Sequence, residues 1–201
     1  MEPQARVAAR LARQHRVVLG ICGAPGAGKS TFAEAVAAAF DGAACVPADG
    51  FHLADVELTR LGRRDRKGAI DTFDAYGYLT LLQRIRAQPS HTVYAPAFAR
   101  DLEQPIAGSI PVAPQTRLIV TEGNYLLDDD APWPAVRDLL DEVWFLDVAR
   151  SERQQRLVKR HTQFGKTAQQ AQAWVRDVDE PNADRIEACR HKADLIVPLP
   201  S

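Results

Sequence analysis

Residues 23–30 read Gly-Ala-Pro-Gly-Ala-Gly-Lys-Ser, and they fill every fixed position of the pattern G-x-x-x-x-G-K-[ST]. The apolar run at residues 17–22 leads into this stretch, and the alanine-rich run at residues 31–40 follows it. An apolar strand, a glycine-rich turn and a helix N-terminus, in that order, place backbone N–H groups around phosphate oxygens. The stretch therefore predicts a binding site for a nucleoside triphosphate at the carboxyl end of a buried strand.

Individual residues of this loop have distinct predicted roles. Gly23, Gly26 and Gly28 let the backbone turn tightly without a side chain in the way. We expect Lys29 to hold the outer phosphates as a charge, and the Ser30 hydroxyl to be a Mg²⁺ ligand, because this hard cation prefers oxygen. The residues expected to contact the nucleotide are Gly23, Ala24, Pro25, Gly26, Ala27, Gly28, Lys29, Ser30 and Thr31.

Length and composition limit the classes of protein to which this chain can belong. Its 201 residues predict a single domain over residues 1–201, and 46% hydrophobic with 25% charged residues is typical of globular proteins. The 25 Lys and Arg against 26 Asp and Glu give a net charge of −1, so we expect neither a nucleic acid nor a membrane as a partner. Three cysteines without a C-x-x-C pair argue against a disulfide framework or a zinc site and favour a cytoplasmic protein.

Short apolar runs alternate with helical stretches, which predicts an α/β fold with a mostly parallel sheet between two layers of helices. The five predicted strands lie at residues 17–22, 43–48, 118–121, 143–147 and 195–197. The predicted helices lie near the N-terminus and at residues 31–40, 76–87 and 152–161. Residues 104–114 break the alternation and predict a small hairpin that turns at Gly108 and Ser109, with Pro105 and Pro111 keeping it at an edge.

Three carboxylates follow predicted strands, at the side of the sheet where open α/β folds bind ligands. Asp49 follows the second strand, Glu122 follows the third, and Asp147 closes the fourth. A carboxylate beside magnesium and a γ-phosphate can hold a metal-bound water or accept the proton of an attacking hydroxyl. Asp49 and Glu122 are the candidates for these tasks, whereas Asp147 is better explained as a polar strand end that leads into the next helix.

The segment after the fourth strand is strongly basic. On the predicted helix, Arg153, Arg156 and Arg160 lie three and four residues apart and share one face. A solvated charged helix would explain such a run, but few acids interrupt it, and the Phe-Gly-Lys stretch at residues 164–166 ends it as a hinge would. We therefore interpret residues 150–170 as a lid whose arginine side chains stabilise charge on a transferred phosphoryl group.

In their order along the chain, these motifs resemble those of the P-loop kinases that include uridine kinase, bacterial type I pantothenate kinase and phosphoribulokinase. Besides the phosphate loop, the similar motifs are DGFH at residues 49–52, RKGAIDTFD at 66–74, EGNYLL at 122–127 and RLVKRH at 156–161. Five ordered motifs are much more specific than a phosphate loop alone. Within the family, the chain looks most like a small bacterial subgroup named nucleoside/nucleotide kinases or fructose-transport kinases.

The resemblance implies transfer of the γ-phosphate of ATP to a hydroxyl of a small molecule, with ATP and Mg²⁺ bound. Asp49 would be the catalytic base on the acceptor hydroxyl. Ser30 and Glu122 would hold Mg²⁺ directly or through water, and Lys29 would act on the transferred phosphate.

The resemblance also assigns roles to the lid and the C-terminal region. Arg156 and Arg160 would close on the phosphates from the lid as further catalytic residues. Asn182, in the stretch EPNADRI, would lie near the adenine. Related kinases form dimers and tetramers, so a homodimer is compatible with the resemblance.

An acceptor-side insertion of residues 50–115 supplies most of the side chains expected around the acceptor. Together with Asp49 and the later Tyr125, the candidates are His52, Arg66, Lys67, Tyr94 and Arg100. His52 is equally well explained as a packed residue, and Arg66 and Lys67 as solvated loop charges. If these two cations point inward, they favour an anionic acceptor. A nucleoside, a pantothenate-like alcohol and a sugar all stay open.

Other classes of protein also contain a phosphate loop. A regulatory GTPase is disfavoured because the chain lacks an N-K-x-D motif for reading guanine. A degenerate kinase that acts as a nucleotide sensor stays open as the alternative. Against it, a pure binding protein needs no carboxylate at the transferred phosphate.

Overall fold

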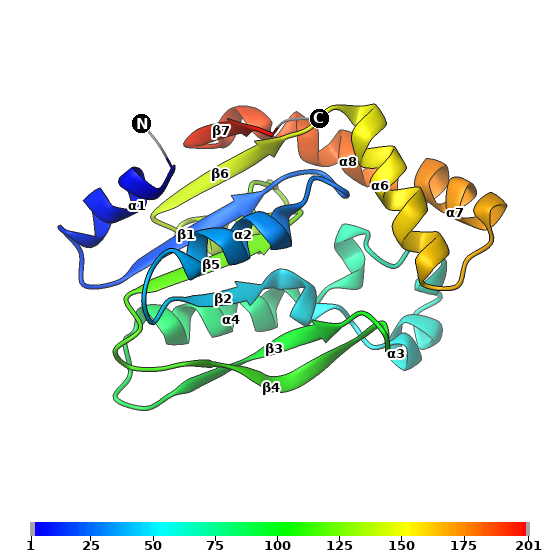
Figure 1. Ribbon diagram of the computed structural model, residues 1–201. Helices are drawn as coiled ribbons and strands as arrows, with labels where there is room; N and C mark the ends of the chain where they lie inside the picture. Colours follow the sequence, from blue (N-terminus) through cyan, green and yellow to red (C-terminus); the bar gives the residue numbers. More distant parts are fainter. Residues whose placement is uncertain (1–2, 200–201) are drawn as a thin grey trace.

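Five parallel strands form one sheet in the order β2-β5-β1-β6-β7, which places β1 at its centre (Figure 1). The computed structural model describes residues 3–199. The chain leaves β1 first toward β2 on one side and later reaches β6 on the other, and ligands bind at the carboxyl ends of strands around such a switch. The strands of this sheet are β1 Val17–Cys22, β2 Ala44–Pro47, β5 Leu118–Gly123, β6 Glu142–Asp147 and β7 Leu195–Pro198.

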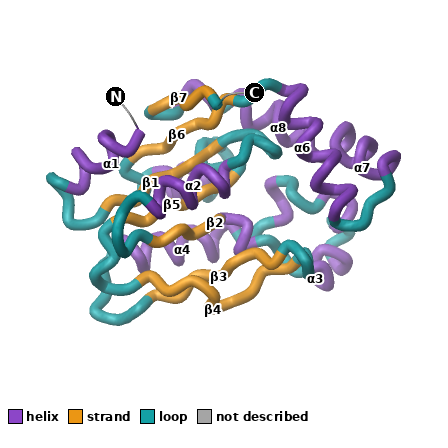
Figure 2. Tube along the Cα trace, in the orientation of Figure 1, coloured by secondary structure: helices purple, strands orange, loops and turns teal. Residues whose placement is uncertain are grey.

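Helices cover both faces of the sheet, and they give the molecule three layers (Figure 2). Neighbouring strand residues point to opposite faces: Val120 packs in a core with Val7 and Ala33, and Ile119 packs in a second core with Tyr78. The first core lies under the first two helices and the second under α4, α5 and α8. The helices are α1 Pro3–Leu11, α2 Lys29–Ala38, α3 Asp55–Arg60, α4 Ala75–Arg86, α5 Trp133–Arg137, α6 Arg150–Gln163, α7 Ala168–Trp174 and α8 Glu180–Ala188.

The predicted fold class is confirmed, because all five predicted strands and the helix after the phosphate loop are present. Their ends differ from the predicted ones by at most two residues. The sequence patterns missed α3, α5, α7 and α8, which are short or polar. Within residues 3–199, no helix combines the length and the apolar character needed to cross a membrane.

The small hairpin exists, but its predicted position is wrong. Its two antiparallel strands are β3 Val93–Ala99 and β4 Gln104–Val112, so Gly108 lies inside a strand. Ala95 pairs with Ile110 and Ala97 pairs with Ile106, which leaves a bulge in β4 between these pairs. Gly108 has a φ of 70°, and a glycine in this left-handed region suits a bulge as well as a turn. The sequence signal was therefore correct about an irregular backbone and wrong about its kind.

Candidate active site

The phosphate loop joins the end of β1 to the start of α2, with left-handed backbone at Gly26 (φ 79°) and Gly28 (φ 85°). A Cβ atom at Gly26 would lie 2.7 Å from the carbonyl oxygen of Arg153, so α6 packs directly on this loop. The buried Lys29 ammonium donates to the Ala24 carbonyl at 3.3 Å. Burial lowers the pKa of Lys29, and nearby Glu122 opposes this shift.

Ser30 and Glu122 meet at the first turn of α2. The Ser30 hydroxyl donates a hydrogen bond to Glu122 Oε1 at 2.9 Å. Glu122 lies at the end of β5 and is 2% exposed. Burial and the neighbouring Asp49 raise the pKa of Glu122 to about 7. A hydroxyl and a carboxylate beside a phosphate loop are oxygen ligands of the kind that Mg²⁺ prefers, and Mg²⁺ takes its other ligands from phosphates and water.

Asp49 lies in a single 3₁₀ turn, Ala48–Phe51, directly after β2. Arg100 donates to its carboxylate at 3.3 Å, and His52 Nε2 lies 3.8 Å from its other oxygen. Burial opposes ionisation of Asp49, but His52, Arg100 and Lys29 outweigh burial and hold its pKa below the ordinary value. Because burial also lowers the pKa of His52, Arg100 is the more dependable source of the charge that keeps Asp49 ionised.

Gly50 lets the hairpin pack against the turn that carries Asp49. A Cβ atom at this position would lie 2.5 Å from the Pro96 carbonyl oxygen of β3. Real Cβ atoms do not approach that closely, so a side chain here would push β3 away from the turn. The glycine in the motif DGFH therefore reflects the close approach of backbone from β3.

One cleft of about 800 Å³ joins the phosphate loop to Asp49 and to α6. It brings together most of the residues expected from the sequence to contact nucleotide, metal or acceptor. The expected residues that line it are Pro25, Gly26, Gly28, Lys29, Ser30, Thr31, Asp49, His52, Lys67, Arg100, Glu122, Arg156, Arg160 and Asn182.

Six expected residues lie outside the lining of this cleft: Gly23, Ala24, Ala27, Arg66, Tyr94 and Tyr125. The first three belong to the phosphate loop itself and are buried. Tyr94 is 58% exposed on β3, and Arg66 pairs with Asp71 at 2.8 Å. The structure therefore gives no support to a direct acceptor contact for either side chain.

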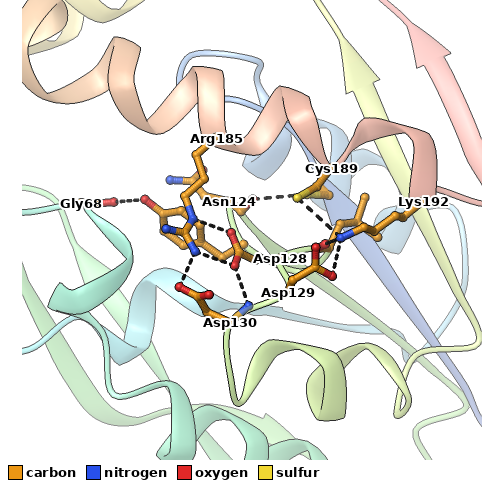
Figure 3. Close-up of polar contacts among 11 residues, drawn as sticks. Gly68, Asn124, Asp128, Asp129, Asp130, Arg185, Cys189 and Lys192 are labelled. Atoms are coloured by element: carbon orange, nitrogen blue, oxygen red, sulfur yellow. Dashed lines mark hydrogen bonds and ion pairs between the residues drawn. The ribbon is translucent and has the colours of Figure 1, made fainter.

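Tyr125 is buried, and its hydroxyl forms a hydrogen bond to a neighbouring loop. Its hydroxyl donates to the Gly68 carbonyl at 2.7 Å, next to Lys67 in the acceptor-side insertion. Beyond it, Arg185 of α8 holds Asp128 with two hydrogen bonds of 2.6 and 2.8 Å (Figure 3). The loop after β5 is thus tied both to the acceptor-side insertion and to α8.

The three lid arginines do not share one environment, which corrects the prediction from helical spacing. Arg153 is 4% exposed, and its guanidinium donates to the Pro25 carbonyl of the phosphate loop at 3.3 Å. Arg156 and Arg160 line the cleft, and Arg156 also pairs with Glu152 at 2.9 Å. Packing of α6 onto the loop, which spacing cannot predict, buries the first of the three.

Sequence reasoning missed several side chains of the cleft. His161 at the end of α6 pairs with Asp179 at 2.7 Å, and the Lys166 ammonium lies 4.5 Å from the centre of the Trp174 ring. Six of the missed residues lie in stretches that the sequence did single out, whereas the others carry no local signal. These six are Gly68, Asn124, Leu157, His161, Phe164 and Lys166. The missed lining residues are Asp55, Arg64, Asp65, Gly68, Phe98, Glu103, Asn124, Leu157, His161, Phe164, Lys166, Trp174 and Asp179.

Comparisons with known proteins agree with the fold. A structure described as a "putative fructose transport system kinase" from Silicibacter sp. TM1040 superposes with a TM-score of 0.85 at 36% identity, covering 98% of this chain and 100% of that one. The ATP-dependent kinase-like protein notR' of Aspergillus versicolor is 36% identical over 159 residues, which are 75% of this chain and 92% of the relative.

A Schizosaccharomyces pombe protein named "Putative uridine kinase C227.14" is 33% identical over 173 residues, which are 81% of this chain and 74% of the relative. The family model described as "Phosphoribulokinase / Uridine kinase family" matches residues 18–201. The resemblance found in the motifs is confirmed over nearly the whole sequence. The chain is a P-loop kinase and belongs to the phosphoribulokinase/uridine kinase family.

Proposed function

We propose that this protein transfers the γ-phosphoryl group of ATP to a hydroxyl of a small molecule, with Mg²⁺ bound. The observation that carries the proposal is the arrangement of Lys29, Ser30, Glu122 and Asp49 in one cleft. Ser30 lies in the first turn of α2, Glu122 near the end of β5, and Asp49 in the turn after β2. Groups of the kind that phosphoryl transfer requires thus come from three separate elements.

The residues present fit both ATP and Mg²⁺. Left-handed backbone at Gly26 and Gly28 opens the loop for phosphate oxygens, and the buried Lys29 ammonium has a carbonyl at 3.3 Å but no carboxylate within ion-pair distance among the described residues. Bound ATP would supply the transferable phosphoryl group, and Mg²⁺ held by Ser30 and Glu122 would balance its charge. Asn182 lines the same cleft, and its place near the adenine stays a proposal.

Four side chains of the cleft then have distinct tasks. Lys29 and Arg160 hold the phosphate oxygens and stabilise the charge on them. Asp49 accepts the proton of the acceptor hydroxyl, and Arg100 at 3.3 Å orients its carboxylate. A weakly basic carboxylate is sufficient, because the loose transition state of phosphoryl transfer demands little proton abstraction.

The test measures ADP formation from Mg-ATP with pantothenate, uridine, cytidine, ribose, fructose, ribulose 5-phosphate and glycerate, together with equilibrium binding of ATP. Asp49→Asn should abolish transfer and leave ATP binding nearly intact, whereas Lys29→Ala should weaken both. Undiminished turnover by Asp49→Asn would show that Asp49 is not the base. Tight ATP binding with no turnover on any acceptor would instead favour a nucleotide sensor.

A further inference from the structure

The cations of the cleft differ in how they are paired. The guanidinium of Arg160, on α6, has no ion pair or hydrogen bond to another residue in the described part of the chain. Burial and the neighbouring Arg100 both lower the pKa of this guanidinium. A guanidinium left unpaired in a cleft is available to an anionic ligand. This is the arrangement expected where a triphosphate binds.

The acceptor side of the cleft is different, because each of its cations already has a carboxylate partner. Lys67 lies 2.6 Å from Asp55 Oδ1, and its ammonium also contacts the Glu103 carbonyl. Arg64 lies 3.1 Å from the other oxygen of Asp55, and Arg100 lies 3.3 Å from Asp49.

Carboxylates also outnumber cations in this part of the lining. Asp49, Asp55, Asp65 and Glu103 line the acceptor side together with the three cations Arg64, Lys67 and Arg100. An anionic acceptor would have to displace Asp55 from both Arg64 and Lys67. Because the carboxylates outnumber the cations here, the net charge of this part of the lining would not attract the anion. Sites that recognise phosphate or carboxylate instead present unpaired arginine or lysine side chains.

Lys166 is a further cleft cation without a carboxylate partner among residues 3–199, as are Lys29 and Arg160. The Lys166 ammonium lies 4.5 Å from the centre of the Trp174 ring, on the lid side of the cleft. A cation–π contact satisfies such a charge only in part. The experiment therefore has to separate Lys166 from the acceptor-side cations.

We propose that the acceptor is an electrically neutral alcohol, without a phosphate or a carboxylate group. This inference rests on the proposed phosphoryl transfer and narrows its substrate class. It favours nucleosides and neutral polyols over sugar phosphates, glycerate and pantothenate. It also reverses the expectation that an inward-facing Lys67 selects an anion, because Asp55 neutralises the ammonium.

The first experiment compares matched pairs of acceptors that differ in charge: pantothenol with pantothenate, ribulose with ribulose 5-phosphate, and glycerol with glycerate. In every pair that supports ADP formation, the neutral member should have the higher kcat/KM, by about tenfold or more, because the site lacks a charge-assisted hydrogen bond for the anion. A higher kcat/KM for the charged member would overturn the inference.

The second experiment needs no turnover, so it stands even if the proposed transfer fails. Calorimetry measures binding of ribulose 5-phosphate and of glycerate to the protein saturated with Mg-ADP. Asp55→Asn frees Lys67 and Arg64, and should strengthen binding of these anions by about tenfold relative to wild type. The matched control is Asp71→Asn, which frees Arg63 and Arg66 outside the lining of the cleft and should leave anion binding unchanged.

Two results would overturn the inference in this assay. Wild-type protein that binds the anions as tightly as Asp55→Asn would show that the acceptor side already accepts negative charge. Tight binding by wild type that Lys166→Met abolishes would assign an anion site to Lys166. Absence of Mg-ADP binding would instead contradict the proposed function itself.

Discussion

At the scale of single residues, Tyr125 lies outside the lining of the cleft but holds the loop that carries Lys67, which lines it. Its hydroxyl bonds to the Gly68 carbonyl at 2.7 Å, and the neighbouring Lys67 faces the acceptor side. Tyr125→Phe removes one oxygen and keeps the buried ring. We expect this change to lower the free energy of unfolding by about 1 kcal/mol, the net value of a hydrogen bond, and to raise the KM for the acceptor with little change in ATP affinity.

The matched control for this variant is Tyr76→Phe, since Tyr76 is 65% exposed on α4 and its hydroxyl has no described partner. Urea denaturation of both variants, with acceptor kinetics, checks the prediction. If Tyr125→Phe leaves stability unchanged but abolishes acceptor binding, then the hydroxyl contacts the acceptor directly, as the sequence first suggested.

At the scale of elements, the first turns of α6 pack against the phosphate loop, and its C-terminal half lines the cleft. The close contact between Gly26 and the Arg153 carbonyl fixes its first turns on the phosphate loop, while Arg160 lies two turns further along. Arg160→Lys keeps the charge and loses the planar fork. It should lower kcat by about 10- to 100-fold, the value of a charge-assisted hydrogen bond, at nearly unchanged ATP affinity.

Lys159→Arg, one residue earlier on the exposed face of α6, is the control and should behave as wild type. Steady-state kinetics with varied ATP, together with direct ATP binding, separates the two parameters. Equal kcat for Arg160→Lys and wild type would show that this end of α6 is a solvated surface helix without a catalytic role.

The same helix illustrates what the sequence could and could not predict. The phosphate loop and the strand before it are contiguous patterns, so residues 17–30 were predicted with their correct structure. Helical spacing placed three arginines on one side but could not identify Arg153 as the one that packs on the loop. That distinction depends on the Pro25 carbonyl, which lies 128 residues away in the chain.

The acceptor side was harder still to predict, because its charges are paired by residues from separate elements. Lys67 is held by Asp55 of α3 and by the Glu103 carbonyl in the hairpin turn. Since the hairpin was placed with the wrong turn, the sequence could not show that the Lys67 charge is neutralised. An inward-facing lysine alone predicts an anion, and the opposite conclusion requires the folded pairing.

At the scale of the whole molecule, one buried carboxylate joins the N-terminal helix to the central sheet. Glu142, 4% exposed at the start of β6, accepts hydrogen bonds from Arg6 and Arg10 of α1 at 2.5 Å each. It also accepts one from Trp144 Nε1 at 2.7 Å. Burial opposes its ionisation, but these hydrogen bonds outweigh burial and hold the pKa of Glu142 below its ordinary value.

This lowered pKa predicts how stability depends on pH. A carboxylate with a depressed pKa in the folded state stabilises the protein fully above its unfolded pKa, about 4.3 for Glu, and the contribution is lost as pH falls through the folded pKa. Glu142→Gln should therefore cost about 1–3 kcal/mol at pH 7, and its deficit against wild type should shrink below about pH 4. Urea unfolding at pH 7, 5, 4 and 3 measures this, with Glu34→Gln on the exposed face of α2 as the control. A deficit that stays constant from pH 7 to pH 3 would mean that Glu142 joins α1 to the sheet through its shape and packing rather than through its charge.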